Sequence, residues 1–239
     1  MDGIYNLPTN TFSSYTHAGI MDPYGEILFY KIDTEVYDKV GNAVGSFDHA
    51  TAGTAEALIV PQPGSCERFY IFQSEKSHST HEIPYFSIYQ FSEDTPGDYL
   101  IYNSTNTFQL EGGLIESWHK GLEQHRWQGV HYAATKERTD FQSNKPVRWI
   151  FISNNNDLYR LDLTCDTLES TNWKYNYNDI GEYSLSLGWR NELEIYEDTV
   201  SNIVRVAVPY QKAGIHIAVF DLDGNNGEVI PGSHKVIDF

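Results

Sequence analysis

The chain of 239 residues has few cysteines and no long apolar run. Its two cysteines, Cys66 and Cys165, are too few for a disulfide scaffold, and their spacing does not match a zinc site. Pairing and free thiols both remain open from the sequence. The longest apolar stretches hold about five or six residues, whereas a helix needs ~20 to span a bilayer. The sequence therefore predicts no membrane insertion.

Cationic side chains are also scarce. Sixteen Lys and Arg stand against 33 Asp and Glu, which gives a net charge of −17 at pH 7. Because such a surface repels phosphate backbones and anionic lipids, we expect no nucleic-acid partner. Residues 1–8 show neither the basic start nor the apolar run of a signal peptide, so an exported form has lost its signal or carries it outside this sequence.

Large apolar side chains are plentiful, with 17 Tyr, 12 Phe and 5 Trp. Short runs of β-branched and aromatic residues, bounded by Gly, Pro, Asn and Asp, recur along the whole chain. No long stretch has a 3.6-residue apolar period, and the best helix candidate, residues 114–124, has glycines at or near both ends. The pattern predicts an all-β protein with at most one short helical turn.

The strand signals group into four units, on the repeat scale of β-propeller blades. These approximate blades are 15–47, 54–105, 106–178 and 183–239 of a single predicted β-propeller-type domain, 1–239. Hairpin signals such as Asp22-Pro23-Tyr24-Gly25 follow one another without crossover helices. The fold class expected is therefore β-propeller-like, with about four antiparallel sheets.

Several segments resemble the opening blades of large β-propeller modules in secreted and cell-surface proteins of Bacteroidetes-type bacteria. The segments that carry this resemblance are 25–30, 36–44, 56–66, 69–72, 191–195, and 218–223 with 227–229. The family is associated with gliding and type IX secretion, so the resemblance implies a propeller fold and an extracellular or cell-surface location. It implies no catalytic residues.

Four units are fewer than the six to eight blades that this family uses, although closed rings of four blades exist. An open ring exposes strand edges, and exposed edges promote association. The chain is therefore expected to be either a small closed propeller or an incomplete ring. An incomplete ring would be completed by a protein partner, a second copy or sequence outside this chain.

Histidine and tryptophan gather between residues 118 and 131. Trp118, His119, Trp127 and His131 form a candidate ligand site, in which aromatic and polar side chains would stack on a sugar ring or grip a peptide. Packing of the two tryptophans beneath a long connection explains the same residues. The pair His78 and His81 fits a solvated loop better than a metal site.

The segment 221–228 places oxygen-bearing side chains at alternate positions. Asp221, Asp223 and Asn225 resemble the start of a calcium loop, but Gly232 stands where the loop would need its final Glu. A hairpin turn between two strands explains the segment more simply. We therefore expect either no cofactor or weak calcium binding.

These observations favour a non-catalytic structural or binding module that mediates protein–protein contact in an extracellular or cell-surface assembly. The sequence shows no Gly-x-Ser-x-Gly elbow and no Gly-rich phosphate loop. Two alternatives stay open: a carbohydrate-active hydrolase, and a lectin that binds glycans at one face of the propeller. Enzymatic activity is uncertain and disfavoured.

Overall fold

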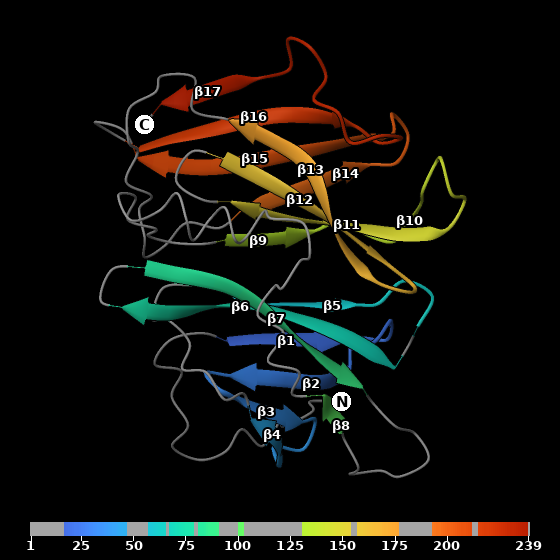
Figure 1. The fold of residues 1–239 in the computed structure, drawn as a ribbon, viewed down its shortest axis with the longest axis vertical. Coiled ribbons are helices and arrows are strands. Elements are labelled where there is room, and N and C mark those ends of the chain that lie inside the picture. The colour runs from blue at the N-terminus through green and yellow to red at the C-terminus, as the bar shows by residue number, and fades with distance from the viewer. Residues whose placement is uncertain are drawn as a thin grey trace. The chain divides into compact units, whose positions relative to one another are not determined.

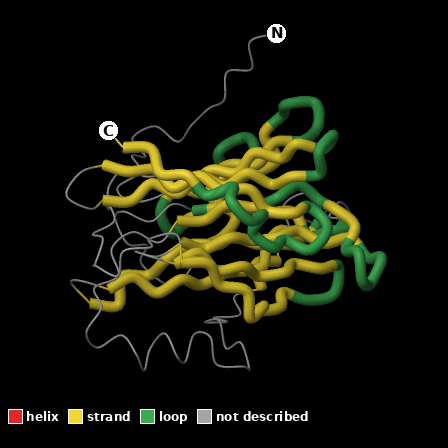
Figure 2. The backbone as a smooth tube through the Cα atoms, turned by 90° about the horizontal axis from the view of Figure 1, so that it is seen from above, coloured by secondary structure: helices red, strands yellow, loops and turns green. Residues whose placement is uncertain are grey.

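The structure is a computed structural model that describes residues 17–46, 57–65, 67–78, 81–90, 100–102, 131–153, 157–176, 193–211 and 215–238. These residues form strands and loops and contain no helix (Figure 2). No helix able to cross a membrane is found within these ranges. The helix candidate at 114–124 lies outside them.

The chain divides into two compact units, each with two antiparallel sheets (Figure 1). The first unit comprises Met1–Pro61 and Cys66–Phe108, and the second comprises Gln62–Ser65 and Gln109–Phe239. The short segment Gln62–Ser65 thus belongs to the second unit, although it directly follows a strand of the first.

The first unit contains two four-stranded sheets in which strands that follow each other in sequence are neighbours. The first sheet consists of β1 (His17–Met21), β2 (Ile27–Ile32), β3 (Glu35–Asp38) and β4 (Ala43–Ser46). The second consists of β5 (Leu58–Pro61), β6 (Arg68–His78), β7 (His81–Gln90) and β8 (Leu100–Tyr102). The first strands of the two sheets, β1 and β5, contact each other.

The core of the first unit is rich in aromatic rings. Phe29 packs edge-on against Phe69 with ring centroids 5.1 Å apart, and it lies 4.5 Å from the ring of Tyr89. Val36 and Ile71 complete the buried cluster. Because strand side chains alternate between faces, Phe29 and Lys31 of β2 lie on the same, core-facing side. Lys31 is fully buried there.

The second unit contains the other two sheets, again with successive strands as neighbours. The first sheet consists of β9 (His131–Ala134), β10 (Arg138–Thr139), β11 (Pro146–Ser153), β12 (Asp157–Thr164) and β13 (Leu168–Asn176). The second consists of β14 (Glu194–Asp198), β15 (Ile203–Gln211), β16 (Ile215–Asp223) and β17 (Lys235–Asp238). The short strands β9 and β10 both pair with β11 and share one edge position.

A local irregularity separates β9 from β10. Thr135 donates its backbone N–H to the carbonyl of Trp149, and its hydroxyl Oγ1 accepts the backbone N–H of Trp149 at 2.9 Å. The side chain thus replaces a ladder bond at the position where the strand is interrupted. β9 and β10 therefore act as one bulged first strand, and the sheet keeps a four-strand plan.

The core of the second unit lies between its two sheets and is largely aliphatic. Alternate residues of the two sheets supply it, including Val147, Phe151 and Leu158 from one sheet and Val206 and Phe220 from the other. All of these side chains are buried. The alternation of buried and half-buried residues along β12 and β15 reflects a sheet with one fully packed face.

The predicted fold class is confirmed: the protein is all-β, with four antiparallel sheets that each follow the up-and-down order of a propeller blade. One sheet falls in each predicted blade range. The single-domain expectation and the proposed completion of a ring by another chain stay predictions.

Candidate functional site

Two turns of the first unit share one hydrogen-bond plan. In the β1–β2 turn, Asp22 Oδ1 accepts the backbone N–H groups of Tyr24 at 2.8 Å and Glu26 at 2.9 Å. In the β3–β4 turn, Asp38 Oδ1 accepts the N–H groups of Val40 at 3.0 Å and of the residue two further on at 2.8 Å. An aspartate at the start of each turn thus fixes the backbone that follows it.

A glycine with positive φ completes each of these turns. Gly25 has φ 85° and Gly41 has φ 91°, and each donates its N–H to the carbonyl of the preceding aspartate. A side chain at either position would be strained in this conformation. The pattern Asp-x-apolar-Gly therefore builds a rigid turn whose third residue lies at the tip.

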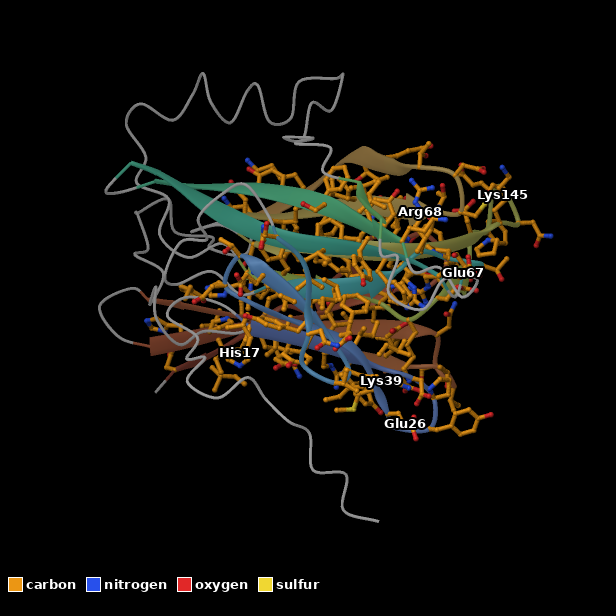
Figure 3. All side chains as sticks on the ribbon, turned by 90° about the horizontal axis from the view of Figure 1, so that it is seen from below. His17, Glu26, Lys39, Glu67, Arg68 and Lys145 are labelled. Atoms are coloured by element: carbon orange, nitrogen blue, oxygen red, sulfur yellow. The ribbon has the colours of Figure 1, made fainter. Side chains whose placement is uncertain are left out.

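The tip residues of the first unit are apolar and exposed. Tyr24 is 92% exposed, Met21 62% and Val40 60%. The two turns lie at the same end of one sheet, about 10 Å apart if each inter-strand step is ~4.8 Å. Figure 3 shows Glu26 and Lys39, one from each turn, at this shared end and His17 at the other.

The second unit repeats this aspartate plan on each of its sheets. In the β10–β11 turn, Asp140 Oδ1 accepts the N–H groups of the second and third residues after it, and Phe141 at the tip is 79% exposed. In the β14–β15 turn, Asp198 Oδ1 accepts the N–H of Val200 at 2.9 Å, and Val200 is 95% exposed. Asn144 and Asn202 take the positive φ that glycine takes in the first unit.

Hydrogen bonding favours the ionised carboxylates of Asp140 and Asp198. Bonds from Ser143 lower the pKa of Asp140, and bonds from Ser201 lower the pKa of Asp198. Because the charged carboxylate is the better acceptor, the turns keep their geometry throughout the neutral range. We call Tyr24, Val40, Phe141 and Val200 the hairpin tips.

An arginine–tryptophan cluster lies beside the core of the second unit. The guanidinium carbon of Arg138 lies 4.0 Å from the ring centroid of Trp149, and that of Arg160 lies 5.0 Å from it. Arg160 Nε also lies 3.0 Å from Asp162 Oδ1. Desolvation lowers the pKa of Arg138 and raises that of Asp162. Trp149 is only 3% exposed, so the cluster packs the sheet interior rather than offering a ring to a ligand.

The predicted calcium ligands are bonded within the protein. Arg205 donates from Nε and Nη2 to the two oxygens of Asp221, at 2.7 and 2.9 Å. Asp223 Oδ1 accepts the backbone N–H of Asn225 at 2.7 Å, and Asn225 Oδ1 accepts an N–H from Asn202 at 2.9 Å. In the described ranges, no group of three or more His, Cys, Asp and Glu is placed to hold a metal ion. Calcium binding stays a prediction.

The turn containing these residues also packs onto the arginine–tryptophan cluster. Arg160 Nη1 donates to the carbonyl of Asn226 at 2.9 Å. Gly227 has φ 74°, and a Cβ there would lie 1.9 Å from Arg160 Nη1. The turn therefore favours glycine for its backbone, and a side chain at this position would displace the Arg160 guanidinium, which gives the segment a structural role as a hairpin turn.

Of the predicted ligand residues, only His131 lies within the described part of the chain. Its side chain is 6% exposed, and burial lowers its pKa to about 4. Neither ring nitrogen has a hydrogen-bond partner among the described residues. Trp118, His119 and Trp127 lie outside those residues, so their ligand role stays a prediction.

Cys165 is exposed and carries a free thiol, whereas Cys66 lies outside the described residues. The neighbourhood of Cys165 is held by Gln62, whose amide donates to the Cys165 carbonyl at 2.5 Å. Gly64 donates its N–H to Glu137 Oε2 at 3.1 Å. These bonds explain why the segment Gln62–Ser65 groups with the second unit.

Sequence reasoning missed the hairpin tips as functional candidates. It identified the turn at Asp22–Gly25 but assigned no role to the residue at its tip. A usable signal was present, because Asp-x-apolar-Gly occurs at 22–25 and again at 38–41. Soluble proteins tend to place polar residues at such positions, so a repeated apolar tip is informative.

No protein-family model matches this chain, and no curated protein matches it. Among solved structures, the chain is similar to an endo-arabinase from Bacteroides thetaiotaomicron VPI-5482, with 11% sequence identity and a TM-score of 0.45. The similarity covers 98% of this chain and 84% of that one. A likeness this distant gives no information about ligand or reaction.

Proposed function

We propose that the chain is a non-catalytic binding module that mediates protein–protein contact in an extracellular or cell-surface assembly. The hairpin tips carry this proposal. Each tip places an apolar side chain in solvent on a turn whose backbone is already fixed by an aspartate. The proposed location is supported by the resemblance of the sequence to secreted propeller modules.

Single exposed apolar residues are common and need no explanation. Here the exposed residue recurs just after the capping aspartate of a turn, on three different sheets. A fixed turn loses little conformational entropy when a partner covers its tip, so more of the apolar burial appears as affinity. Tyrosine is enriched among residues that dominate protein interfaces. Tyr24 is therefore the expected anchor.

Affinity capture from the extracellular fraction of the source organism tests the proposal, with captured proteins identified by mass spectrometry. We expect one protein to be captured reproducibly by the wild-type chain and lost with the double variant Tyr24→Ser and Val40→Ser. The matched control is Lys39→Ser, which changes an exposed polar side chain in the same turn as Val40. This control should capture as the wild type does.

The same preparations should also be tested on a glycan array. A wild-type chain that captures no protein but binds glycans would contradict the proposal if the double variant binds the same glycans equally well. Equal capture by the wild type and the double variant would also contradict it, because the tips would then have no part in the contact.

A further inference from the structure

Tyr24 and Glu26 lie two residues apart in the β1–β2 turn, and both face solvent. Tyr24 is 92% exposed, and Glu26 is also exposed. Figure 3 shows Glu26 at the end of the first sheet that carries the hairpin tips. Because consecutive Cα atoms are about 3.8 Å apart, the Cα atoms of these two residues lie within ~7.6 Å of each other. One group of a partner can therefore contact both side chains.

A single carboxylate oxygen fixes the backbone of both residues. Asp22 Oδ1 accepts the N–H of Tyr24 at 2.8 Å and the N–H of Glu26 at 2.9 Å. Gly25, which stands between them, has φ 85° and donates its N–H to the Asp22 carbonyl at 3.0 Å. The backbone positions of the ring and the carboxylate are therefore set relative to each other before anything binds, which lowers the entropy cost of binding.

The Glu26 carboxylate forms no ion pair with any of the described residues, although Lys39 lies in the neighbouring turn. It is therefore open to a cation from outside the chain. A metal ion is not the expected cation, because no group of three or more His, Cys, Asp and Glu in the described ranges is placed to hold one. A cationic side chain of a partner protein needs only one carboxylate and suits this position better.

The second unit contains the same two types of side chain at the same spacing, and there they already hold a cation. Asp157 and Tyr159 are two residues apart on β12, so their side chains lie on one face of the strand. Lys174 Nζ lies 2.9 Å from Asp157 Oδ2 and 5.4 Å from the ring centroid of Tyr159. A carboxylate and an aromatic ring thus bind one ammonium group together. Tyr24 and Glu26 offer the same two groups in the reverse order.

Another pair of this kind, Glu194 and Tyr196 on β14, is less suited to a cation from outside. Both side chains are exposed and lie on one face of the strand. Arg205 lies directly opposite Tyr196 on β15 and therefore shares that face. Its guanidinium, which donates to both oxygens of Asp221, already places a cation beside this ring. This pair therefore provides a matched control.

Arginine is the cationic side chain that fits Tyr24 and Glu26 best. Its planar guanidinium stacks on aromatic faces and can donate two parallel N–H groups to a carboxylate. It is also less strongly hydrated than an ammonium group, so contact with a ring costs it less desolvation. Stacking of this kind already occurs in this protein, where the guanidinium carbon of Arg138 lies 4.0 Å from the ring centroid of Trp149.

We propose that Tyr24 and Glu26 together bind an arginine side chain of the partner protein, with the guanidinium stacked on the Tyr24 ring and hydrogen-bonded to the Glu26 carboxylate. The inference rests on the proposed contact function and deepens it, because it names the chemical group that this tip receives. A partner with only apolar residues at this point would desolvate Glu26 without pairing its charge, which is costly. The net charge of −17 also attracts a cationic surface.

A short arginine peptide tests the site without the captured protein. The probe is acetyl-Leu-Arg-Leu-amide, and its matched control carries citrulline, which has the shape of arginine but no charge. NMR titrations follow the ring resonances of Tyr24 and the resonances of the peptide. We expect the wild type to bind the arginine peptide with a millimolar dissociation constant and the citrulline peptide at least about threefold more weakly.

Three variants assign the preference for arginine to the two side chains. Glu26→Gln keeps the size of the side chain but removes its charge, so it should weaken the arginine peptide about threefold and leave the citrulline peptide unchanged. Tyr24→Phe keeps the ring and should keep the preference. Glu194→Gln makes the same change in the pair beside Arg205 and should bind both peptides as the wild type does. Far-UV circular dichroism checks that each variant folds.

Equal affinity of the wild type for the two peptides would overturn the inference. A Glu26→Gln variant that keeps the full preference for arginine would also overturn it, because the carboxylate would then have no part in binding. The capture experiment with the Tyr24→Ser and Val40→Ser variant remains separate. Capture lost in that variant, together with equal affinity for the two peptides, would keep the contact function and reject arginine recognition. Unchanged capture by that variant would contradict the contact function, whichever peptide binds better.

Discussion

In the part of the chain that the structure describes, each unit encloses one buried base, Lys31 in the first and His131 in the second, and the two units accommodate it differently. In the first unit, Lys31 lies in an aromatic core and donates from Nζ to the carbonyl of Asp33. In the second, His131 is buried in β9 beside the mostly aliphatic core, with no hydrogen-bond partner among the described residues. Burial lowers the pKa of Lys31 to about 8 and that of His131 to about 4.

This difference separates the pH ranges in which the two units lose stability. Stability rises with pH wherever the unfolded chain binds more protons than the folded one. For His131 that range runs from about 4 up to 6.5, and for Lys31 it runs from about 8 up to 10.5. At pH 7 the second unit thus carries no cost from its histidine, whereas the first still carries the cost of a buried ammonium.

The largest effects should come from truncating one core at a time. Phe29→Ala removes the ring that joins the two sheets of the first unit, and Phe220→Ala does the same in the second. Each should lower the free energy of unfolding by about 3–5 kcal/mol. Hydrogen exchange with peptide resolution should show the loss confined to the unit that carries the change. Equal loosening of both units by either variant would contradict the division into two cores.

The acid sensitivity of the second unit should depend on His131. The interval from 6.5 to about 4 corresponds to about 3 kcal/mol of stability, which is present above pH 6.5 and lost as pH falls to 4. His131→Leu keeps the position apolar and removes the titrating group. Urea unfolding at a series of pH values should show a flatter acid limb for this variant than for the wild type. An unchanged limb would mean that another group controls acid unfolding.

Lys31 should have the opposite signature. Lys31→Met keeps the length of the side chain but removes the buried charge, so at pH 7 it should stabilise the chain by about 2 kcal/mol. The rise in stability between pH 8 and 10.5 should disappear. Lys39→Met, which changes an exposed lysine of the same sheet region, serves as the control. Destabilisation at pH 7 by Lys31→Met alone would show that the hydrogen bond to Asp33 outweighs the cost of burial.

The smallest effects should come from the turn aspartates. Asp22→Ala removes an acceptor of two backbone N–H groups and should cost about 1 kcal/mol. Asp22→Asn keeps an oxygen at the same position and should cost less than half as much. Thermal unfolding measures both variants. If alanine and asparagine have the same effect, the carboxylate charge rather than the hydrogen bonds maintains the turn.

The sequence predicted the sheets well because strand formation depends on local patterns. The run Ile27–Ile32 and the glycine of the turn before it specify a hairpin through side-chain alternation and backbone conformation alone. The same alternation places Lys31 on the face of Phe29, so the pattern predicts that Lys31 is buried. The charge of the lysine side chain predicts exposure instead.

The features that sequence reasoning missed depend on long-range packing. His131 was expected in a ligand site because of its neighbours in sequence, yet its environment is set by strands that follow it. The close approach of Gly227 to Arg160 joins positions 67 residues apart, and no local pattern indicates it. The exposure of Tyr24 likewise emerges only when the sheets are assembled.

The two units also differ in how they present their hairpin tips. The first unit holds Tyr24 and Val40 at one end of a single sheet, whereas the second has Phe141 and Val200 on separate sheets. Two tips at one end of one sheet present two apolar side chains to the same partner, and the residues that dominate an interface tend to cluster in this way. The first unit should therefore supply most of the binding energy.

The most direct test of the proposed contact function compares these two pairs of tips against the captured protein in one titration calorimetry series. Replacing Tyr24 and Val40 with Ser should weaken binding by about tenfold or more, and replacing Phe141 and Val200 with Ser should weaken it by less than about threefold. Binding that neither pair of replacements changes would contradict the assignment of the hairpin tips as the contact surface.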